Sequence, residues 1–200
     1  MTRPAKTLSS FKSALIGGGV RPNLFEVQLT TVPAGVTWNA DTMSFMCKAA
    51  QIPASNIASV DVPFRGRILK VAGDRTVDNW TVTIINDENM QLRRGFEMWV
   101  EHMARLDNNV GATNPAAYMM QATVFQLGRG GARNATDNNG EEQVILAEYE
   151  FRDIFPVNVS PIELSFDSSD TIEEYTVEFA VNSIVNPNTS GPTPEPEDEE

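Results

Sequence analysis

Residue types that commonly carry catalysis are few in this 200-residue sequence, and they lie far apart. His102 is the only histidine, so a histidine-based metal site is excluded, and a nucleophile–base pair would depend on one imidazole. It falls within a segment of helical apolar periodicity. We therefore expect a partly buried structural histidine rather than a ligand or a base.

Cys47 is the only cysteine, which excludes an intramolecular disulfide and a CxxC metal site. It follows Phe45 and Met46 in an apolar run, so we expect a small buried side chain rather than a reactive thiolate. The glycines at 128, 130 and 131 lack the Gly-Lys-Ser/Thr ending of a phosphate-binding loop. The sequence therefore predicts neither a cofactor nor a metal.

Acidic residues at alternate positions are the remaining candidates for acid–base chemistry. Glu148 and Glu150 would lie on one face of a strand, where a carboxylate pair could serve as acid and base but is first of all a solvated surface. We predict no catalytic residue. An enzyme that uses a carboxylate pair is kept as an alternative, and it would require a pocket with perturbed acids.

The composition predicts one acidic, water-soluble domain. Fifteen Lys and Arg against 27 Asp and Glu give a net charge of -12, which repels phosphate and disfavours nucleic-acid binding over the whole surface. No stretch approaches the ~20 apolar residues of a membrane span, and the N-terminus makes a poor signal peptide. We expect folding in the cytosol and no membrane insertion by this chain.

Alternating apolar and polar residues predict several strands that each have one wet face. In the clearest case, Phe25, Val27 and Leu29 alternate with polar residues. Further strands are expected around 80–84, 118–124, 145–152 and 174–181. Antiparallel strands of this kind form a β-barrel or β-sandwich, so the predicted fold class is mainly β.

One segment has the period of a helix instead of a strand. Its apolar residues are Leu92, Phe96, Trp99, Val100, Met103 and Leu106. The pattern predicts one amphipathic α-helix at about 89–106, capped by Asp87 or Asn89 and supported by an ion pair between Glu101 and Arg105.

Three segments have no periodicity. Residues 1–21 contain three consecutive glycines, at 17–19, and are predicted to form a flexible N-terminal arm. Residues 128–142, GRGGARNATDNNGEE, are predicted to form an exposed loop, and residues 186–200, rich in proline and ending in acids, a disordered acidic tail. A β-barrel domain at 22–185 remains.

The segment 43–78 is apolar at first and then locally basic, and it predicts a hairpin. The simplest interpretation is an ordinary hairpin with a solvated basic face. The alternative is a projecting hairpin that meets an acidic surface on another copy, where charge complementarity sets the register. The residues concerned are Val60, Val62, Phe64, Arg65, Arg67, Lys70 and Arg75.

The same region resembles the central block of tail tube proteins from contractile-tailed phages of the T-even type. The similar strings are PFRGRILKVAGDRT at 63–76 and DNWTVTIINDENMQLRRGFEMWV at 78–100. They join a turn at Gly73 to Arg75, a strand with Trp80 and the entry into the helix at 86–88. The resemblance continues more loosely over about residues 8–185.

The resemblance implies a barrel or sandwich with one helix, completed as a continuous barrel in a hexameric ring whose copies stack into a tube. It assigns ring stacking to the hairpin residues named above. It also implies a virion protein, assembled in the host cytoplasm, with these partners: itself, the tail sheath protein, baseplate tube-initiator proteins, and the tape measure and tail terminator proteins.

Phage DNA would pass through such a tube without specific binding, because a wall of carboxylates and hydroxyls repels its phosphates. The candidate lumen residues are Glu148, Glu150, Glu174, Thr176 and Glu178. The outer face toward the sheath is an equally good place for these acids, so the assignment is a hypothesis.

Two further functions stay open from the sequence. The first has the same fold as the tail tube proteins: a tube protein of a contractile injection or type VI secretion system, or a baseplate tube-initiator protein. The other is a barrel that binds oligosaccharide or single-stranded nucleic acid, which predicts a basic groove with interleaved aromatic residues.

Overall fold

The computed structural model describes residues 7–15, 18–36, 38, 40–129, 144–167 and 170–187. Most of the predicted loop at 128–142 and of the acidic tail, and part of the N-terminal arm, lie outside these residues. The helices are α1 (Leu8–Ala14), α2 (Ala40–Met46), α3 (Gln91–Met103) and the 3-10 turn η2 (Pro115–Ala117). The strands are β1 (Phe25–Leu29), β2 (Cys47–Ala50), β3 (Ser55–Phe64), β4 (Arg67–Val77), β5 (Trp80–Ile85), β6 (Met120–Leu127), β7 (Ile145–Val159), β8 (Glu174–Ala180) and β9 (Ser183–Val185).

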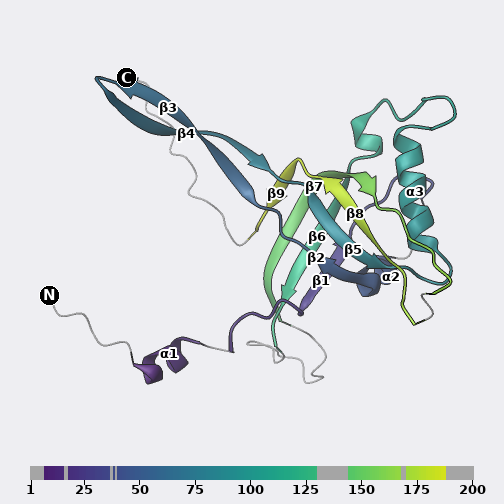
Figure 1. Cartoon of the computed structure of the whole chain (residues 1–200), viewed down its shortest axis with the longest axis horizontal. Helices are drawn as coiled ribbons and strands as arrows, with labels where there is room; N and C mark the ends of the chain where they lie inside the picture. Colours follow the sequence, from purple (N-terminus) through teal and green to yellow (C-terminus); the bar gives the residue numbers. More distant parts are fainter. Residues whose placement is uncertain are drawn as a thin grey trace.

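Seven strands form one antiparallel sheet in the order β1-β6-β7-β8-β5-β2, and β9 pairs with β7 (Figure 1). The predicted mainly β, antiparallel fold with one amphipathic helix is therefore confirmed. Among the described strands, β1 pairs only with β6 and β2 only with β5, so each leaves one edge of the sheet unpaired within the protomer.

The long strand β7 changes partners along its length. Its first part pairs with β6 and β9, and its last part, from Phe155 to Val159, pairs with β8. Asp153, with φ 56°, lies where the partner changes. Such a break in the pleat lets a single strand bend from one set of neighbours to the next.

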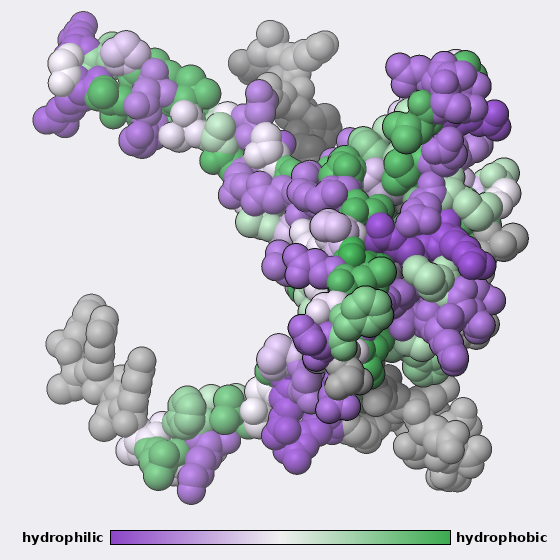
Figure 2. All heavy atoms as spheres, turned by 45° about the vertical axis from the view of Figure 1, so that its right-hand side comes forward, coloured by the Kyte–Doolittle hydropathy of each residue, from purple (hydrophilic) through white to green (hydrophobic). Residues whose placement is uncertain are grey.

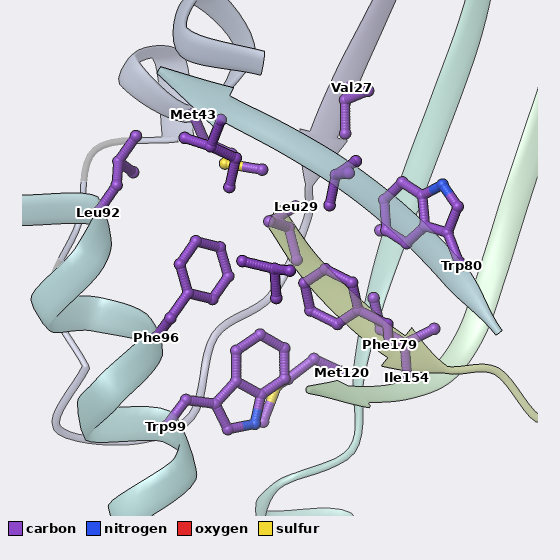
Figure 3. Close-up of a cluster of buried hydrophobic side chains, with 14 of the residues drawn as sticks. Val27, Leu29, Met43, Trp80, Leu92, Phe96, Trp99, Met120, Ile154 and Phe179 are labelled. Carbon is purple, nitrogen blue, oxygen red and sulfur yellow. The ribbon is translucent and has the colours of Figure 1, made fainter. Parts of the chain in front are cut away.

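The core lies on one face of the sheet, beneath α3 (Figure 3). The alternation predicted for β5 and β8 is confirmed, since Val82 and Ile84 are fully buried, as are Val177 and Phe179. Trp80 stacks on Phe151 of β7, with ring centroids 4.5 Å apart. Aromatic side chains thus connect the middle strands, and burying rings of this size contributes much of the stability of a core.

Helix α3 buries the predicted stripe but ends earlier than expected. Phe96 and Trp99 are fully buried, whereas Leu106 is 95% exposed, because the backbone turns extended at Ala104. Asp87, one of the two predicted caps, accepts hydrogen bonds from the first backbone amides of the helix. The ion pair on the helix is not the predicted one at its end: it joins Arg93 to Glu97 at 2.7 Å.

Two segments extend away from the body on the same side (Figure 1). One is the hairpin β3–β4, which forms a two-stranded sheet of its own, and the other contains α1. The predicted hairpin region at 43–78 was too broad at its start, since its first residues complete α2 and form β2. No helix in the described part of the chain is long and apolar enough to cross a membrane.

Candidate assembly surfaces

The chain reverses direction between β3 and β4 at Arg65 and Gly66, where no turn was predicted. Arg65 (φ 47°) and Gly66 (φ 78°) both have positive φ, as a two-residue turn of type I′ requires. The turn expected at Gly73 to Arg75 was wrong, because these residues lie inside β4.

Gly73 has a different role, at an irregularity in the hairpin ladder. Ile57 pairs with Arg75 and Ser59 with Ala72, so one residue of β3 faces two of β4 there. A Cβ atom on Gly73 would lie 3.1 Å from the carbonyl oxygen of Ala58. The glycine therefore permits close packing at a β-bulge, which increases the twist of the hairpin.

One face of the hairpin is apolar and unburied. Val60 pairs with Val71 and Val62 with Leu69, while Phe64 pairs with Arg67 at the tip. Paired residues of an antiparallel ladder point to the same face. Phe64 is 66% exposed and Leu69 62% exposed, and Figure 2 shows hydrophobic side chains along this extension. We call Val60, Val62, Phe64, Leu69 and Val71 the apolar face of the hairpin.

The structure therefore separates the predicted stacking residues. Val60, Val62, Phe64 and Arg67 share the apolar face, and Arg65 forms the turn with its guanidinium 5.3 Å from the centre of the Phe64 ring. Lys70 lies on the opposite face, where it pairs with Asp61 at 3.0 Å.

Arg75, the last predicted stacking residue, lies near the base of the hairpin and donates a hydrogen bond to Ser55. Leu69 and Val71 of the apolar face were not among the predicted stacking residues. The alternation of Leu69, Val71 and polar neighbours in β4 was the signal that could have identified them.

The five predicted lumen residues all lie on the face of the sheet opposite the core. In β8, Glu174, Thr176 and Glu178 alternate with side chains that are buried beneath α3. In β7, Glu148 and Glu150 are two residues apart and point to the same face, whereas Phe151 is buried on the opposite face. These outward side chains are the wet face of β7 and β8, but the structure does not bring the two groups together. Glu150 pairs with Thr123 of β6 and Val185 of β9, whereas Glu178 pairs with Thr81 of β5 and with Asn158 near the other end of β7.

Bases and amides partly balance the acids of this wet face. Glu174 pairs with Lys48 of β2 at 2.5 Å. Arg152 lies 2.9 Å from Glu150 and holds the pKa of that carboxyl below its usual value through a hydrogen bond and its charge. Glu178 accepts a hydrogen bond from the side chain of Asn79.

Cys47 and the charged side chains are the groups of this chain that could carry chemistry. Burial raises the pKa of the Cys47 thiol to about 12, which keeps it protonated and unreactive near neutral pH. No charged side chain is buried, and no group of His, Cys, Asp and Glu is arranged to hold a metal, among the described residues.

Residues 20–184 match the family model for the phage tail tube protein. The chain is 32% identical to tail tube protein gp19 of Enterobacteria phage T4 over 166 residues, which are 83% of this chain and 91% of that protein. It is 31% identical to tail tube protein gp19 of Enterobacteria phage T6 over the same shares.

A solved structure shows the same fold at low identity. The chain resembles a component of the sheath-tube complex of an extracellular contractile injection system, with a TM-score of 0.52 and 11% identity over 91% of this chain and 98% of that one. The family match covers both the sheet and the projecting hairpin. The chain therefore belongs to the phage tail tube protein family.

Proposed function

We propose that this protein builds the inner tail tube of a contractile phage tail, in which hexameric rings stack into the conduit for DNA ejection. The observation that carries the proposal is the family match over residues 20–184. The exposed apolar face of the hairpin supports it, because monomeric proteins rarely expose such a patch without a partner.

Within a ring, the unpaired edges of β1 and β2 are the surfaces through which neighbouring copies associate. An open sheet edge presents unpaired backbone N–H and C=O groups, which favour aggregation. Pairing this edge with a strand of the next copy satisfies those groups. Repetition around a closed ring then yields one continuous barrel. The association is heterologous, because β1 and β2 are different edges.

Between rings, the hairpin is the stacking element, with Val60, Val62, Phe64, Arg65, Arg67, Lys70 and Arg75 as the proposed contact residues. Its apolar face gains stability when another copy covers it, by about 1.5–3 kcal/mol for a fully buried side chain of this size.

The test of stacking is the pair of substitutions Val62→Ser and Phe64→Ser, assayed by negative-stain electron microscopy and by thermal melting. We expect rings without long tubes and an unchanged melting midpoint, because neither side chain packs on the core. The matched control is Ser59→Ala with Thr76→Ala, which alters exposed polar residues of the same hairpin. Normal tubes from the serine variant would contradict the proposal.

The wet face of β7 and β8 forms the lumen wall in this proposal, with Glu148, Glu150, Glu174, Thr176 and Glu178 exposed to the conveyed DNA. Carboxylates there repel phosphate, so DNA slides without binding. The tail sheath surrounds the tube, and the baseplate tube initiators, the tape measure protein and the tail terminator meet it at its ends or in its lumen.

Replacing Glu148 and Glu178 with lysine tests this assignment. We expect tubes that still form but virions that eject DNA poorly, because cations in the wall retain the phosphate backbone. The measurement is infectivity per assembled particle, with Glu101→Lys on the outer helix as control. Full infectivity of the lysine virions would remove these residues from the lumen.

A further inference from the structure

The connection between β7 and β8 carries an exposed surface that neither the sheet nor the hairpin uses. Leu164 is 81% exposed, Phe166 is fully exposed and Ile172 is 72% exposed. Residues 160–166 and 171–174 border a hollow of about 740 Å³. An uncovered phenyl ring beside a hollow of this size indicates a surface that another molecule covers.

Acidic residues lie close to these apolar residues along the chain. Glu163, Asp167 and Asp170 are exposed, and none of them forms an ion pair with another described residue. The acids beside β8 differ in this respect, because Glu174 is engaged by Lys48 and Glu173 by the side chain of Asn86. We call Glu163, Leu164, Phe166, Asp167, Asp170 and Ile172 the acidic seat.

We propose that the acidic seat receives the tip of the hairpin from a copy in the adjacent ring. This inference rests on the proposed function, since it names the partner surface of the stacking hairpin. The tip combines Phe64 with Arg65 and Arg67, so it offers an apolar ring and cations to a surface of apolar side chains and free carboxylates. Such complementarity fixes register and excludes wrong contacts.

The two surfaces lie at opposite ends of the sheet, as stacking requires. The register of β5 on β8 pairs Trp80 with Phe179 and Ile85 with Glu174. The hairpin precedes Trp80, whereas the acidic seat precedes Glu174, so a full strand length separates them (Figure 1). Each copy has the hairpin tip at one end and the acidic seat at the other. Repeated contact between these two surfaces therefore generates an open-ended stack.

The reach of the hairpin is also sufficient. Strands β3 and β4 contain 10 and 11 residues, whereas β5 contains 6. At about 3.3 Å per residue, the hairpin extends roughly 33 Å, and the body strand spans about 20 Å. The tip therefore reaches well beyond the end of its own sheet, as contact with the next copy requires.

Reciprocal charge reversal tests the pairing. One variant carries Arg65→Asp and Arg67→Glu in the tip, where aspartate tolerates the left-handed turn position. The other carries Glu163→Lys and Asp167→Lys in the acidic seat. We expect each variant alone to lower the mass of sedimentable tubes by about tenfold while rings persist, and the combination of all four substitutions to restore tubes to near the original amount.

The control is Asp107→Lys, which reverses an exposed acid outside the acidic seat, and thermal melting checks that every variant is folded. If the unmodified protein forms no tubes with its baseplate partners, the proposed function fails. If it forms tubes and the acidic-seat variant does so equally well, only this inference fails. Tubes lost in each single variant but not restored in the combination would also overturn the pairing.

A crosslink gives a second readout that does not depend on tube yield. Cysteines introduced by Phe64→Cys and Phe166→Cys, in a background with Cys47→Ala, should form intermolecular disulfides in oxidised tubes. Ladders of linked chains are expected on a non-reducing gel. Monomers from intact tubes would contradict contact between the hairpin tip and the acidic seat.

Discussion

Gly95 lies in the middle of α3 with the indole of Trp38 directly over it. A Cβ atom at this position would be 2.4 Å from Cε3 of Trp38, which is far inside contact distance. The indole itself is held by Phe96 and Trp99, with ring centroids 4.7 Å and 6.2 Å away. Here packing, and not backbone freedom, explains a glycine inside a helix.

Gly95→Ala is therefore expected to destabilise the protein, although alanine is the better helix former by about 1 kcal/mol. Overpacking costs roughly 1–3 kcal/mol, so we predict a net loss of up to about 2 kcal/mol in the free energy of unfolding. Urea denaturation of the unassembled subunit measures it, with Met98→Ala on the exposed side of α3 as control. A stabilised Gly95→Ala variant would show that Trp38 is free to move aside.

At the scale of elements, the hairpin and the body differ in how they are held. Strands β3 and β4 have no core beneath them, whereas β5 and β8 are buried on one face. A two-stranded sheet is marginally stable alone in water. We therefore expect the hairpin to be less stable than the body of the sheet in the lone subunit.

Hydrogen exchange should separate the two classes of strand. In the unassembled subunit, we expect the amides of β3 and β4 to exchange about a hundredfold or more faster than those of β5 and β8. In tubes, the hairpin amides should become protected, while those of β8 change little. Equal protection of hairpin and core strands in the lone subunit would contradict this description.

The sequence predicted the elements whose pattern is local. Strand β1 and the alternation in β5 and β8 follow from one apolar face, and the stripe of α3 from its period. The second half of β7 was not predicted, because Pro156 and Asn158 interrupt the alternation there. Strands β2 and β9, at 4 and 3 residues, are too short to give a period.

The candidate surfaces were predicted by residue type but not by arrangement. Within each of β7 and β8, the candidate lumen residues share one face, as the alternation of side chains along a strand requires. Their partners could not be read from the sequence, because Lys48 and Glu174 are 126 residues apart along the chain. The hairpin turn was misplaced, because the positive φ of Arg65 has no strong signal in an arginine.

At the scale of the whole molecule, the protomer has the features of an incomplete assembly. Its sheet has unpaired edges at β1 and β2, and its hairpin exposes an apolar face. The acidic seat lies at the opposite end from that hairpin. In the proposed assembly, association at the sheet edges would close a ring and association of the hairpin with the acidic seat would stack rings, so two pairs of surfaces would specify the two directions of growth.

Electron cryo-microscopy of the protein assembled on its baseplate partners tests this account most directly. We predict a hollow tube of six-fold rings, with β1 of each copy beside β2 of the next and the wet face of β7 and β8 toward the lumen. Solid filaments, isolated monomers, or a tube with α3 lining the channel would contradict it.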